Sequence, residues 1–348
     1  MPRVMLSQLQ VQQNYHNLGN ALPGCKLFYA MKCNSDLGVL RSLIDVNARF
    51  DVATNGEIDI LNSLGVELTS ENCIHTHPIK SIESIDYAIS KGVKTFVVDN
   101  FYEVDKLIGK DCDVLIRVSF PNPNVKVDLS SKFGIHPDQF MDLYNACVDA
   151  GVLVRGISFH VGSNCGNSEM HVSAIKRCLP FMQTLGLRTL DIGGGFPCFA
   201  SMSIRGNIET FCGPIREVLE GAPFEVIAEP GRYIVASAMY MYATVVGKSI
   251  RGDTIWYYLD TSVYGMCSGI LGDHAEYNLE APADRVDNVQ FKTVFGGCSC
   301  DSIDVIAKYD LYPELLVGDK VLIRDIGAYS NATATTFNGI PLPVIEVI

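Results

Sequence analysis

A lysine that could act as a nucleophile directly follows a short apolar segment near the start of the chain. Lys32 comes after residues 27–31, Leu-Phe-Tyr-Ala-Met, a run that predicts a strand buried on both faces. An ammonium group in such a place is costly unless it is exposed, paired or used covalently. In a dry pocket a lysine loses its proton easily, and the free amine can form a Schiff base with an aldehyde. Because many lysines at strand ends simply reach into solvent, the surrounding residues must decide.

Three consecutive glycines and an arginine could bind an anion. Gly193, Gly194 and Gly195 follow an apolar run that ends at Ile192. Glycines let backbone N–H groups approach an oxyanion closely, and the start of a helix adds a favourable dipole. Arg232 could clamp the same anion, for example a phosphate, with its guanidinium group. A flexible turn and an ordinary ion pair at a helix start are the competing interpretations.

A carboxylate and three histidines complete the candidate polar residues. Glu229 lies three residues before Arg232, and facing a pyridine nitrogen it would keep that nitrogen protonated and make the ring an electron sink. His160 could stack on such a flat ring, although a lone histidine at a strand end is more often structural. His75 and His77 have a spacing typical of metal ligands. Because no third ligand is near them in the sequence, we favour a structural role and expect no metal site.

These residues need elements that bring them together, and the sequence predicts a parallel barrel. Short β-branched and aromatic runs alternate with helical patterns from residue 25 to about residue 237. Eight strand–helix repeats favour an α/β fold of the (β/α)8 type over a doubly wound sheet, which rarely reaches eight regular units. The expected strands are 25–31, 50–54, 73–77, 95–100, 113–120, 153–162, 189–193 and 224–229. The expected helices are 36–45, 56–64, 82–91, 101–109, 137–150, 168–185 and 208–219.

The C-terminal ends of these strands would form one mouth, where such barrels keep their active sites. Beyond the barrel, the chain changes to strands and turns, which predicts a separate β-domain. We therefore expect an N-terminal strand and helix over 1–24, the barrel over 25–237 and a C-terminal β-domain over 238–348. The polar residues at the strand ends are Lys32, Asp51, His75, His77, Asp99, Arg117, His160, Ser163, Gly193, Gly194, Gly195, Glu229 and Arg232.

The composition narrows the classes of function. The chain has 348 residues, a net charge of -12 and no dense run of Lys or Arg, which argues against nucleic acid and anionic membranes as partners. Its most apolar stretch is interrupted by Glu225, Glu229 and Arg232, so we expect no membrane span. Twelve cysteines without a framework spacing indicate reduced thiols. We expect a cytoplasmic protein that acts on a small molecule.

Nine motifs run in order along nearly the whole chain. They are YAMKCN around Lys32, FDVATNGEI from Phe50, SSKFG from Ser130, HVGSNC from His160, DIGGGFP from Asp191, EPGRYIVASA from Glu229, VYG with GDH between Val263 and His274, CDSIDVI from Cys300, and GAYSNATATTFNG from Gly327. Together they resemble the fold-type III family of pyridoxal phosphate (PLP) decarboxylases, most closely the ornithine and lysine decarboxylases. The resemblance implies a barrel with a C-terminal β-domain, as in alanine racemase and ornithine decarboxylase.

The resemblance also implies roles for individual residues. Lys32 would bind PLP as a Schiff base, His160 would stack on its ring, and Glu229 would pair with the pyridine nitrogen. Asp51 and Arg117 would line the site. The residues expected to hold the phosphate are Ser163, Gly193, Gly194, Gly195, Gly231, Arg232 and Tyr329.

A second group would act on the substrate. Cys300 would return a proton to the substrate carbon after carbon dioxide leaves, and a thiol is a competent donor near neutral pH. Asp273 and Asp301 would receive the distal ammonium group, with Phe337 packed beside it. A turn residue and a helix cap are the ordinary alternatives for these two aspartates. In the family, Cys300 and Asp301 would reach the PLP site of a partner subunit, which implies a homodimer with active sites at the interface.

The chain departs from the family pattern in two places. Gly272 stands where a tyrosine usually precedes the aspartate, and Gly297-Cys298-Ser299 replaces Gly-Pro-Thr. Our hypothesis is that Gly272 leaves room for a substrate longer or bulkier than ornithine. The alternatives are a decarboxylase of a modified, carrier-bound or diaminopimelate-like amino acid and, less favoured, a non-catalytic regulator resembling the antizyme inhibitors. An alanine racemase-like activity is disfavoured because Cys300 replaces its second base, a tyrosine.

Overall fold

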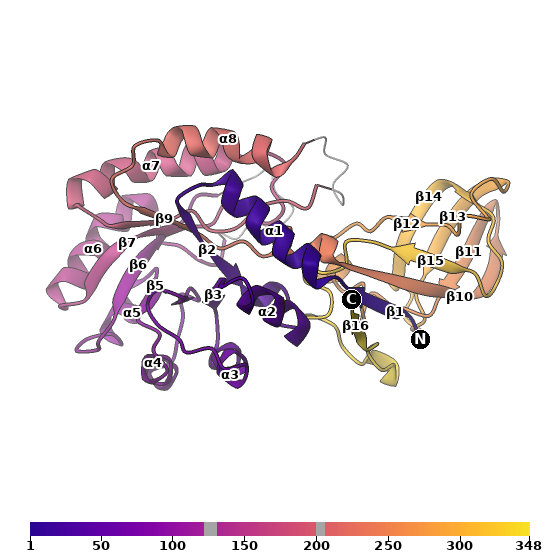
Figure 1. Cartoon of the computed structure of the whole chain (residues 1–348), viewed down its shortest axis with the longest axis horizontal. Coiled ribbons are helices and arrows are strands. Elements are labelled where there is room, and N and C mark those ends of the chain that lie inside the picture. Colours follow the sequence, from indigo (N-terminus) through magenta and orange to yellow (C-terminus); the bar gives the residue numbers. More distant parts are fainter. Residues whose placement is uncertain (122–130, 200–205) are drawn as a thin grey trace.

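The computed structural model describes residues 1–121, 131–199 and 206–348 of the chain. It contains a barrel of strands wrapped by helices and a second domain built mostly of sheet, joined side by side (Figure 1). The two-part architecture expected from the sequence is therefore confirmed. Ser130, the first residue of the SSKFG motif, lies outside the described residues.

Eight parallel strands close into the barrel in sequence order. Closure is made by β2 and β9, where Cys25 lies opposite Val226. All eight predicted strands are present because each is a short run of apolar residues buried on both faces. The strands are β2 (Cys25–Ala30), β3 (Arg49–Val52), β4 (Cys73–His75), β5 (Thr95–Val98), β6 (Asp113–Val118), β7 (Leu153–Phe159), β8 (Thr189–Asp191) and β9 (Glu225–Ala228).

Five apolar side chains from five of these strands form a small cluster of their own, separate from the main core, and fill the barrel interior. They are Phe28, Ile74, Val97, Leu115 and Ile227. The main core is much larger. It packs the outer face of the barrel strands against the helices and continues into the second domain. The barrel is thus a packed core, and its polar groups are confined to its ends.

The helices return the chain from the end of one strand to the start of the next. Several begin at a polar side chain that accepts a hydrogen bond from the first turn, the arrangement favoured at helix starts. These capping residues are Asp36, Thr54, Ser81, Asn100 and Asn207. The helices are α2 (Leu37–Ile44), α3 (Asn55–Ser63), α4 (Ile82–Ser90), α5 (Phe101–Asp105), η2 (Pro137–Gln139), α6 (Phe140–Asp149), α7 (Glu169–Leu185) and α8 (Ile208–Leu219).

The second sheet is built around the long strand β10. It pairs with β11 and with β15, and the N-terminal strand β1 also joins it, with Val4 opposite Met241. The helix α1 (Gln8–Ala21) then leads from β1 to the barrel. The remaining elements are β1 (Arg3–Leu6), α9 (Arg232–Val235), η4 (Ala236–Ala238), β10 (Met239–Arg251), β11 (Thr254–Leu259), α10 (Gly269–Asp273), β12 (Leu279–Glu280), β13 (Gln290–Gly296), β14 (Val305–Pro313), β15 (Lys320–Ile323), η5 (Phe337–Gly339) and β16 (Ile345–Val347).

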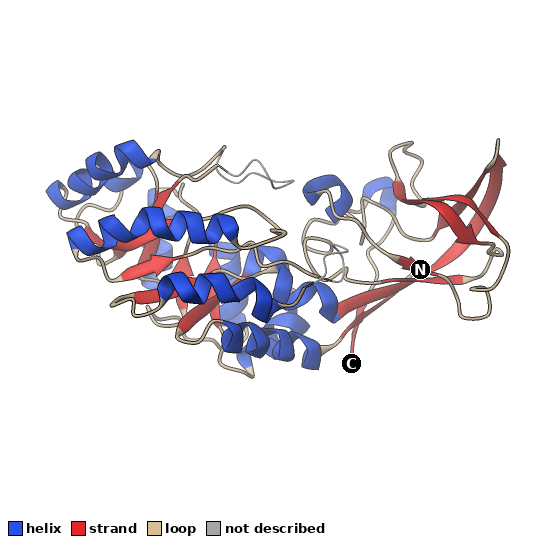
Figure 2. Ribbon diagram, turned by 90° about the horizontal axis from the view of Figure 1, so that it is seen from above, coloured by secondary structure: helices blue, strands red, loops and turns tan. Residues whose placement is uncertain are grey.

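The C-terminus lies near the junction between the barrel and the second sheet, whereas the N-terminus lies along the second sheet (Figure 2). The strands β1 and β16 pair in parallel, with Val4 opposite Ile345, so the first and last strands of the chain hold each other in place. The division of the chain after residues 24 and 237 stays a proposal. Across the described residues, every helix is too short or too polar to cross a bilayer.

Candidate active site

A cavity of about 260 Å³ opens at the C-terminal ends of the barrel strands. It brings together residues that lie as far apart in the sequence as Lys32 and Tyr329. Lys32 stands in a short turn, η1 (Met31–Cys33), directly after β2. The predicted residues in its wall are Lys32, His160, Ser163, Gly194, Gly195, Glu229, Gly231, Arg232, Asp273 and Tyr329. The wall also contains Ala30, Asn164, Phe196, Gly272 and Thr333.

The amine of Lys32 projects into this cavity, and 41% of its side chain is exposed. Its Nζ lies 3.4 Å from Oδ2 of Asp51, which is buried and accepts a 2.5 Å hydrogen bond from Thr76 Oγ1. Burial lowers the pKa of Lys32, but the negative charge of Asp51 beside it raises the pKa, and the net shift is upward. The neighbouring carboxylate therefore favours the ammonium form of the free side chain, whereas the sequence predicts an amine that loses its proton easily.

The glycine segment after β8 brings the backbone close to the cavity residues. Gly193 has a φ of 65°, and a Cβ added there would lie 2.2 Å from the carbonyl oxygen of Phe159. A Cβ on Gly194 would lie 2.8 Å from the Glu229 carbonyl oxygen and 3.0 Å from His160 Nε2. Only glycine fits at Gly193, since both the positive φ and the contact exclude a side chain. Gly193 itself lies behind the cavity wall and shapes the segment.

His160 is held as a neutral ring beside this segment. Its Nδ1 accepts a 3.2 Å hydrogen bond from the backbone N–H of Gly162. Burial, together with the positive charges of Arg117 and Lys32, holds the pKa of His160 well below its usual value. Arg117 itself lies among carboxylates, and burial lowers its pKa although Glu229 and Asp99 oppose this effect. A neutral imidazole at the cavity wall can stack on a flat ring without adding charge to the site.

Glu229 shares its buried position with a second carboxyl group, that of Asp191. Burial and the negative charges of Asp191 and Asp51 hold the pKa of Glu229 well above its usual value. Asp191 accepts hydrogen bonds from the Gly193 N–H at 2.9 Å and from Ser158 Oγ at 3.0 Å. Glu229 therefore retains a proton, which it shares with Asp191 through their side-chain hydrogen bond.

Arg232 closes one side of the cavity. Its guanidinium group lies 5.1 Å from the centre of the Tyr329 ring, and Nη2 donates to Ser163 Oγ at 3.4 Å. It also forms an ion pair with Asp273. The family resemblance implies a phosphate partner for Arg232 and a substrate partner for Asp273, whereas in the structure the two residues pair with each other. Within the described part of the chain, Nε of Arg232 is buried and has no hydrogen-bond acceptor.

Three predicted residues lie together outside this cavity. Cys300 is exposed, and its backbone N–H donates to Asn338 Oδ1 at 3.1 Å. Tyr264 links the other two, because its hydroxyl donates to Asp301 Oδ2 at 2.6 Å and its ring lies 4.3 Å from that of Phe337. One chain therefore gathers Cys300, Asp301 and Phe337 on a surface of the second domain, away from Lys32.

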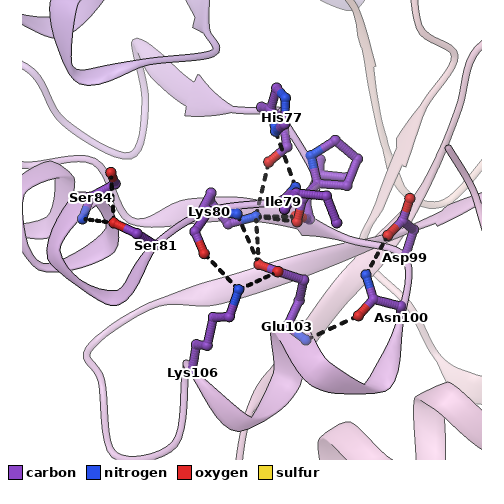
Figure 3. Close-up of polar contacts among 11 residues, drawn as sticks. His77, Ile79, Lys80, Ser81, Ser84, Asp99, Asn100, Glu103 and Lys106 are labelled. Atoms are coloured by element: carbon purple, nitrogen blue, oxygen red, sulfur yellow. Dashed lines mark hydrogen bonds and ion pairs between the residues drawn. The ribbon is translucent and has the colours of Figure 1, made fainter. Parts of the chain in front are cut away.

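Lys80, a buried lysine that was not predicted from the sequence, links two segments at the end of the barrel (Figure 3). Nζ of Lys80 donates to the carbonyl oxygens of His77, Pro78 and Val97 at 2.9, 2.8 and 2.7 Å. Glu103 lies 3.9 Å away and accepts from the Lys80 backbone N–H. These bonds tie the segment after β4 to the end of β5. The sequence signal that could have identified this residue is a lysine three residues after the predicted strand 73–77, in Pro78-Ile79-Lys80.

The two histidines with metal-like spacing both lie beside aromatic rings. His75 is buried with its ring 5.6 Å from that of Phe96, and burial, with Lys80 and His77 nearby, lowers its pKa to about 3. The ring of His77 packs against Phe133. Among the described residues, no group of three or more candidate ligands could hold a metal ion.

Two further polar residues of the site also escaped assignment. Asp191 appears in the sequence only as the start of the motif that contains the glycines. A carboxylate at the end of a buried strand is costly, and this cost alone indicates a paired or functional residue. Thr76 follows β4 and bonds Asp51. Its signal was weaker, since a threonine beside a strand is common.

A closed parallel barrel with an amine, a glycine cradle and a protonated carboxyl at its mouth defines a class of cofactor-dependent enzymes. The family model described as "Pyridoxal-dependent decarboxylase, pyridoxal binding domain" matches residues 8–236. A lysine/ornithine decarboxylase of Selenomonas ruminantium is 35% identical, over 97% of this chain and 87% of that protein. The antizyme inhibitor 2 of Xenopus laevis is 34% identical, over 92% of this chain and 75% of that protein.

Solved structures give the same result. The lysine/ornithine decarboxylase of Vibrio vulnificus, complexed with cadaverine, superposes with a TM-score of 0.92 at 38% identity and covers 100% of this chain and 94% of that one. The chain belongs to the pyridoxal-dependent decarboxylase family. It is a PLP-dependent amino-acid decarboxylase, as the motifs had indicated.

The residues of the cavity fit PLP. The amine of Lys32 projects into the cavity and can reach an aldehyde. The backbone at Gly194 and Gly195 lies very close to neighbouring atoms. A side chain on either residue would fill the space between the backbone and those atoms. Among the described residues, none offers a hydrogen-bond acceptor to the buried Nε of Arg232. A phosphate oxygen of the cofactor would supply one.

Proposed function

We propose that this enzyme decarboxylates a basic L-amino acid with a second amino group, of the ornithine and lysine kind, to the corresponding diamine and carbon dioxide. The observation that carries the proposal is the position of Asp273, a carboxylate in the wall of the cavity that also contains Lys32. A carboxylate there favours a substrate with a distal ammonium group. The similarity to the Vibrio vulnificus enzyme, complexed with the diamine cadaverine, supports the same substrate class.

In this proposal Lys32 would bind the aldehyde of the cofactor through Nζ, and His160 would stack on its ring. Glu229 would pair with the pyridine nitrogen, while Asp51 and Arg117 would line the site. The phosphate is held by Arg232, Ser163, Tyr329 and the backbone of Gly193, Gly194, Gly195 and Gly231. The close approach of Gly194 to both His160 and Glu229 supports this arrangement.

PLP, when bound, supplies an electron sink that stabilises the carbanion left by the departing carbon dioxide. Glu229 would provide the proton that keeps this sink effective, because its carboxyl group is protonated in the buried pair with Asp191. Placing a cationic ring nitrogen beside the pair would then favour the ionised carboxylate of Glu229. His160 stays neutral throughout, since its pKa lies well below its usual value.

The proton that completes the product would come from Sγ of Cys300 in a partner subunit. Cys300 and Asp301 lie away from the Lys32 cavity of their own chain, so a second copy must supply them. We therefore propose a homodimer with active sites at the interface. Phe337, which packs beside Tyr264 near Asp301, would line the same substrate pocket.

Recognition of the distal ammonium group would require Asp273 to leave Arg232. A phosphate group beside Arg232 would compete for its guanidinium, and Asp273 would then be available to the substrate. Asp301 of the partner would supply the second carboxylate. A substrate without the ammonium group would leave two carboxylates poorly paired, which gives strong discrimination.

Gly272 supports a pocket with room for a long side chain. It lines the cavity, and a Cβ added there would meet no atom within 4 Å among those described. The usual tyrosine would occupy this space. We infer that lysine or an N-substituted diamino acid is accepted besides ornithine.

The experiment is product analysis after incubation with ornithine, lysine, arginine, diaminopimelate and an N-substituted diamino acid. The proposal predicts diamines from ornithine and from at least one longer substrate. Strict preference for ornithine would refute the role of Gly272, and preference for diaminopimelate would refute the substrate class.

A cytoplasmic location is part of the proposal. All twelve cysteines are free thiols in the structure, and ten of them are buried or half-buried. This use of cysteine is typical of proteins that work in a reducing compartment.

A further inference from the structure

Two cysteines differ from the other ten in being exposed, and they are separated by one residue. Cys298 and Cys300 both lie on the loop that follows β13. Exposed thiols react with oxidants far more readily than buried ones. In the single chain, oxidation would therefore be directed to this pair. In the proposed dimer Cys300 would face the cavity of the partner subunit, so the oxidant must be a molecule as small as a peroxide.

The loop holds the two residues within reach of each other. Residues two apart in sequence span at most about 7 Å, and the chain bends through 298–300, which shortens that distance. A disulfide requires a Cα separation of roughly 4.4–6.8 Å. The bend thus brings the Cα atoms of the two cysteines toward the range that a disulfide requires.

Hydrogen bonds fix the backbone at each position of the loop. The N–H of Cys298 donates to the Thr261 carbonyl oxygen at 3.0 Å, and the N–H of Cys300 donates to Asn338 Oδ1 at 3.1 Å. Between them, the N–H of Ser299 donates at 2.9 Å to Oδ2 of the buried Asp304. Because the backbone is held, bond formation depends mainly on rotation of the two side chains.

We propose that Cys298 and Cys300 form a reversible disulfide, a modification site that blocks the enzyme under oxidising conditions. A peroxide oxidises one thiolate to a sulfenic acid and is reduced to water. The second thiol then attacks this sulfur, forms the S–S bond and releases a second water. Two thiols thereby lose two hydrogens and two electrons. A small-molecule thiol reverses the step by exchange, and an exposed bond in so small a ring is readily reduced.

The effect on turnover rests on the proposed function, in which Sγ of Cys300 is the proton donor. A disulfide sulfur carries no proton, so the oxidised enzyme would still bind PLP through Lys32 but fail to complete the product. Cys298 takes no part in the reaction. Its contribution is to capture an oxidised Cys300 before further, irreversible oxidation.

The test treats the PLP-loaded enzyme with hydrogen peroxide, alkylates the remaining free thiols, and maps the peptides by mass spectrometry without reduction. In the wild type, the peptide containing 298–300 should escape alkylation and be lighter by two hydrogen atoms. Turnover should fall by roughly 10²-fold or more and should return after dithiothreitol. The buried cysteines serve as the internal control.

The matched variant is Cys298→Ser, which should start with wild-type turnover. It should form no link, and dithiothreitol should restore less of its turnover after peroxide. Alkylation of both cysteines in the treated wild type, or equal recovery of the two proteins, would overturn the proposal. A link that forms while turnover is unchanged would support the modification site and instead refute Cys300 as the proton donor.

Discussion

The chemistry at the residue scale depends on carboxylates that hold protons where the cofactor needs them. Glu229 and Asp191 are buried together, so the pair retains a proton that an exposed glutamate would lose near neutral pH. Lys32 lies beside Asp51 and keeps its own proton until the cofactor arrives. In the proposed function, cofactor binding would require Lys32 to give up this proton, and Asp51 lies 3.4 Å from its Nζ.

At this scale, Cys300→Ala should separate cofactor binding from product formation. The variant should bind PLP normally, because Cys300 lies outside the Lys32 cavity of its own chain. Amine production should fall by roughly 10²–10⁴-fold, the usual contribution of a positioned acid. Some intermediate should instead be protonated at the cofactor carbon. Product yield and rate, measured against Cys298→Ala as control, check the prediction. Unchanged values in Cys300→Ala would remove the thiol from the mechanism.

The sequence predicts which residues form the site better than it predicts which of these residues contact one another. The types of Lys32, Glu229 and Arg232, each at the end of a predicted strand, were enough to suggest a shared mouth. The pairing of Arg232 with Asp273 could not be foreseen, because the two residues are 41 positions apart and belong to different domains of the fold. The raised pKa of Lys32 also depends on neighbours that only the folded barrel provides.

At the element scale, the barrel was predictable and the second sheet only partly so. The eight barrel strands are buried on both faces, and such runs are recognisable without partners. In the second sheet, Lys308 and Asp310 interrupt the apolar residues of β14, and β12 has only two residues, so neither strand is recognisable from the sequence alone. Strands that face water on one side depend on their neighbours more than on their own composition.

The segment between β4 and β5 gives a stability prediction at this scale. Lys80→Met should destabilise the protein by about 3–5 kcal/mol, because it leaves the carbonyl oxygens of His77, Pro78 and Val97 without their ammonium donor. Glu103 keeps its ion pair with Lys106. Urea unfolding measures the change. The control is Lys94→Met, which removes a solvent-exposed ion pair with Asp111 and should cost at most about 1 kcal/mol. Equal free energies of unfolding for the two variants would show that the Lys80 contacts do not stabilise this end of the barrel.

For the whole molecule, buried histidines predict how stability depends on pH. Burial lowers the pKa of His171 to about 4 and, with Lys80 and His77, that of His75 to about 3, from an ordinary 6.5. Below pH 6.5 the unfolded chain binds protons that the folded chain does not. The stability contributed by these two neutral histidines is therefore fully present above pH 6.5 and is lost as the pH decreases toward 4, by up to about 1.4 kcal/mol per pH unit for each histidine.

Urea unfolding of wild type and His171→Gln over that pH range checks this expectation. Glutamine can still donate to the Gly194 carbonyl oxygen, which His171 contacts at 2.9 Å, but it does not titrate. The variant should lose less stability per pH unit than the wild type. Parallel pH profiles would contradict a neutral, buried His171.

The proposed dimer predicts complementation between two inactive variants. Lys32→Ala and Cys300→Ala should each lack activity when assembled alone. In a mixed dimer, one site would combine an intact Lys32 with an intact Cys300 from the other subunit. Random assembly of equal amounts should thus restore about a quarter of wild-type turnover. Absence of recovery in demonstrably mixed dimers would mean that each chain completes its own site.

The most direct test of the account concerns the amine of Lys32. Borohydride treatment of the PLP-loaded enzyme, followed by peptide mass spectrometry, should place the reduced cofactor on Lys32. The visible absorption of the wild type should be missing in Lys32→Ala. A cofactor attached to another residue would contradict the account, and a wild-type protein that stays colourless with added PLP would indicate a regulator rather than an enzyme.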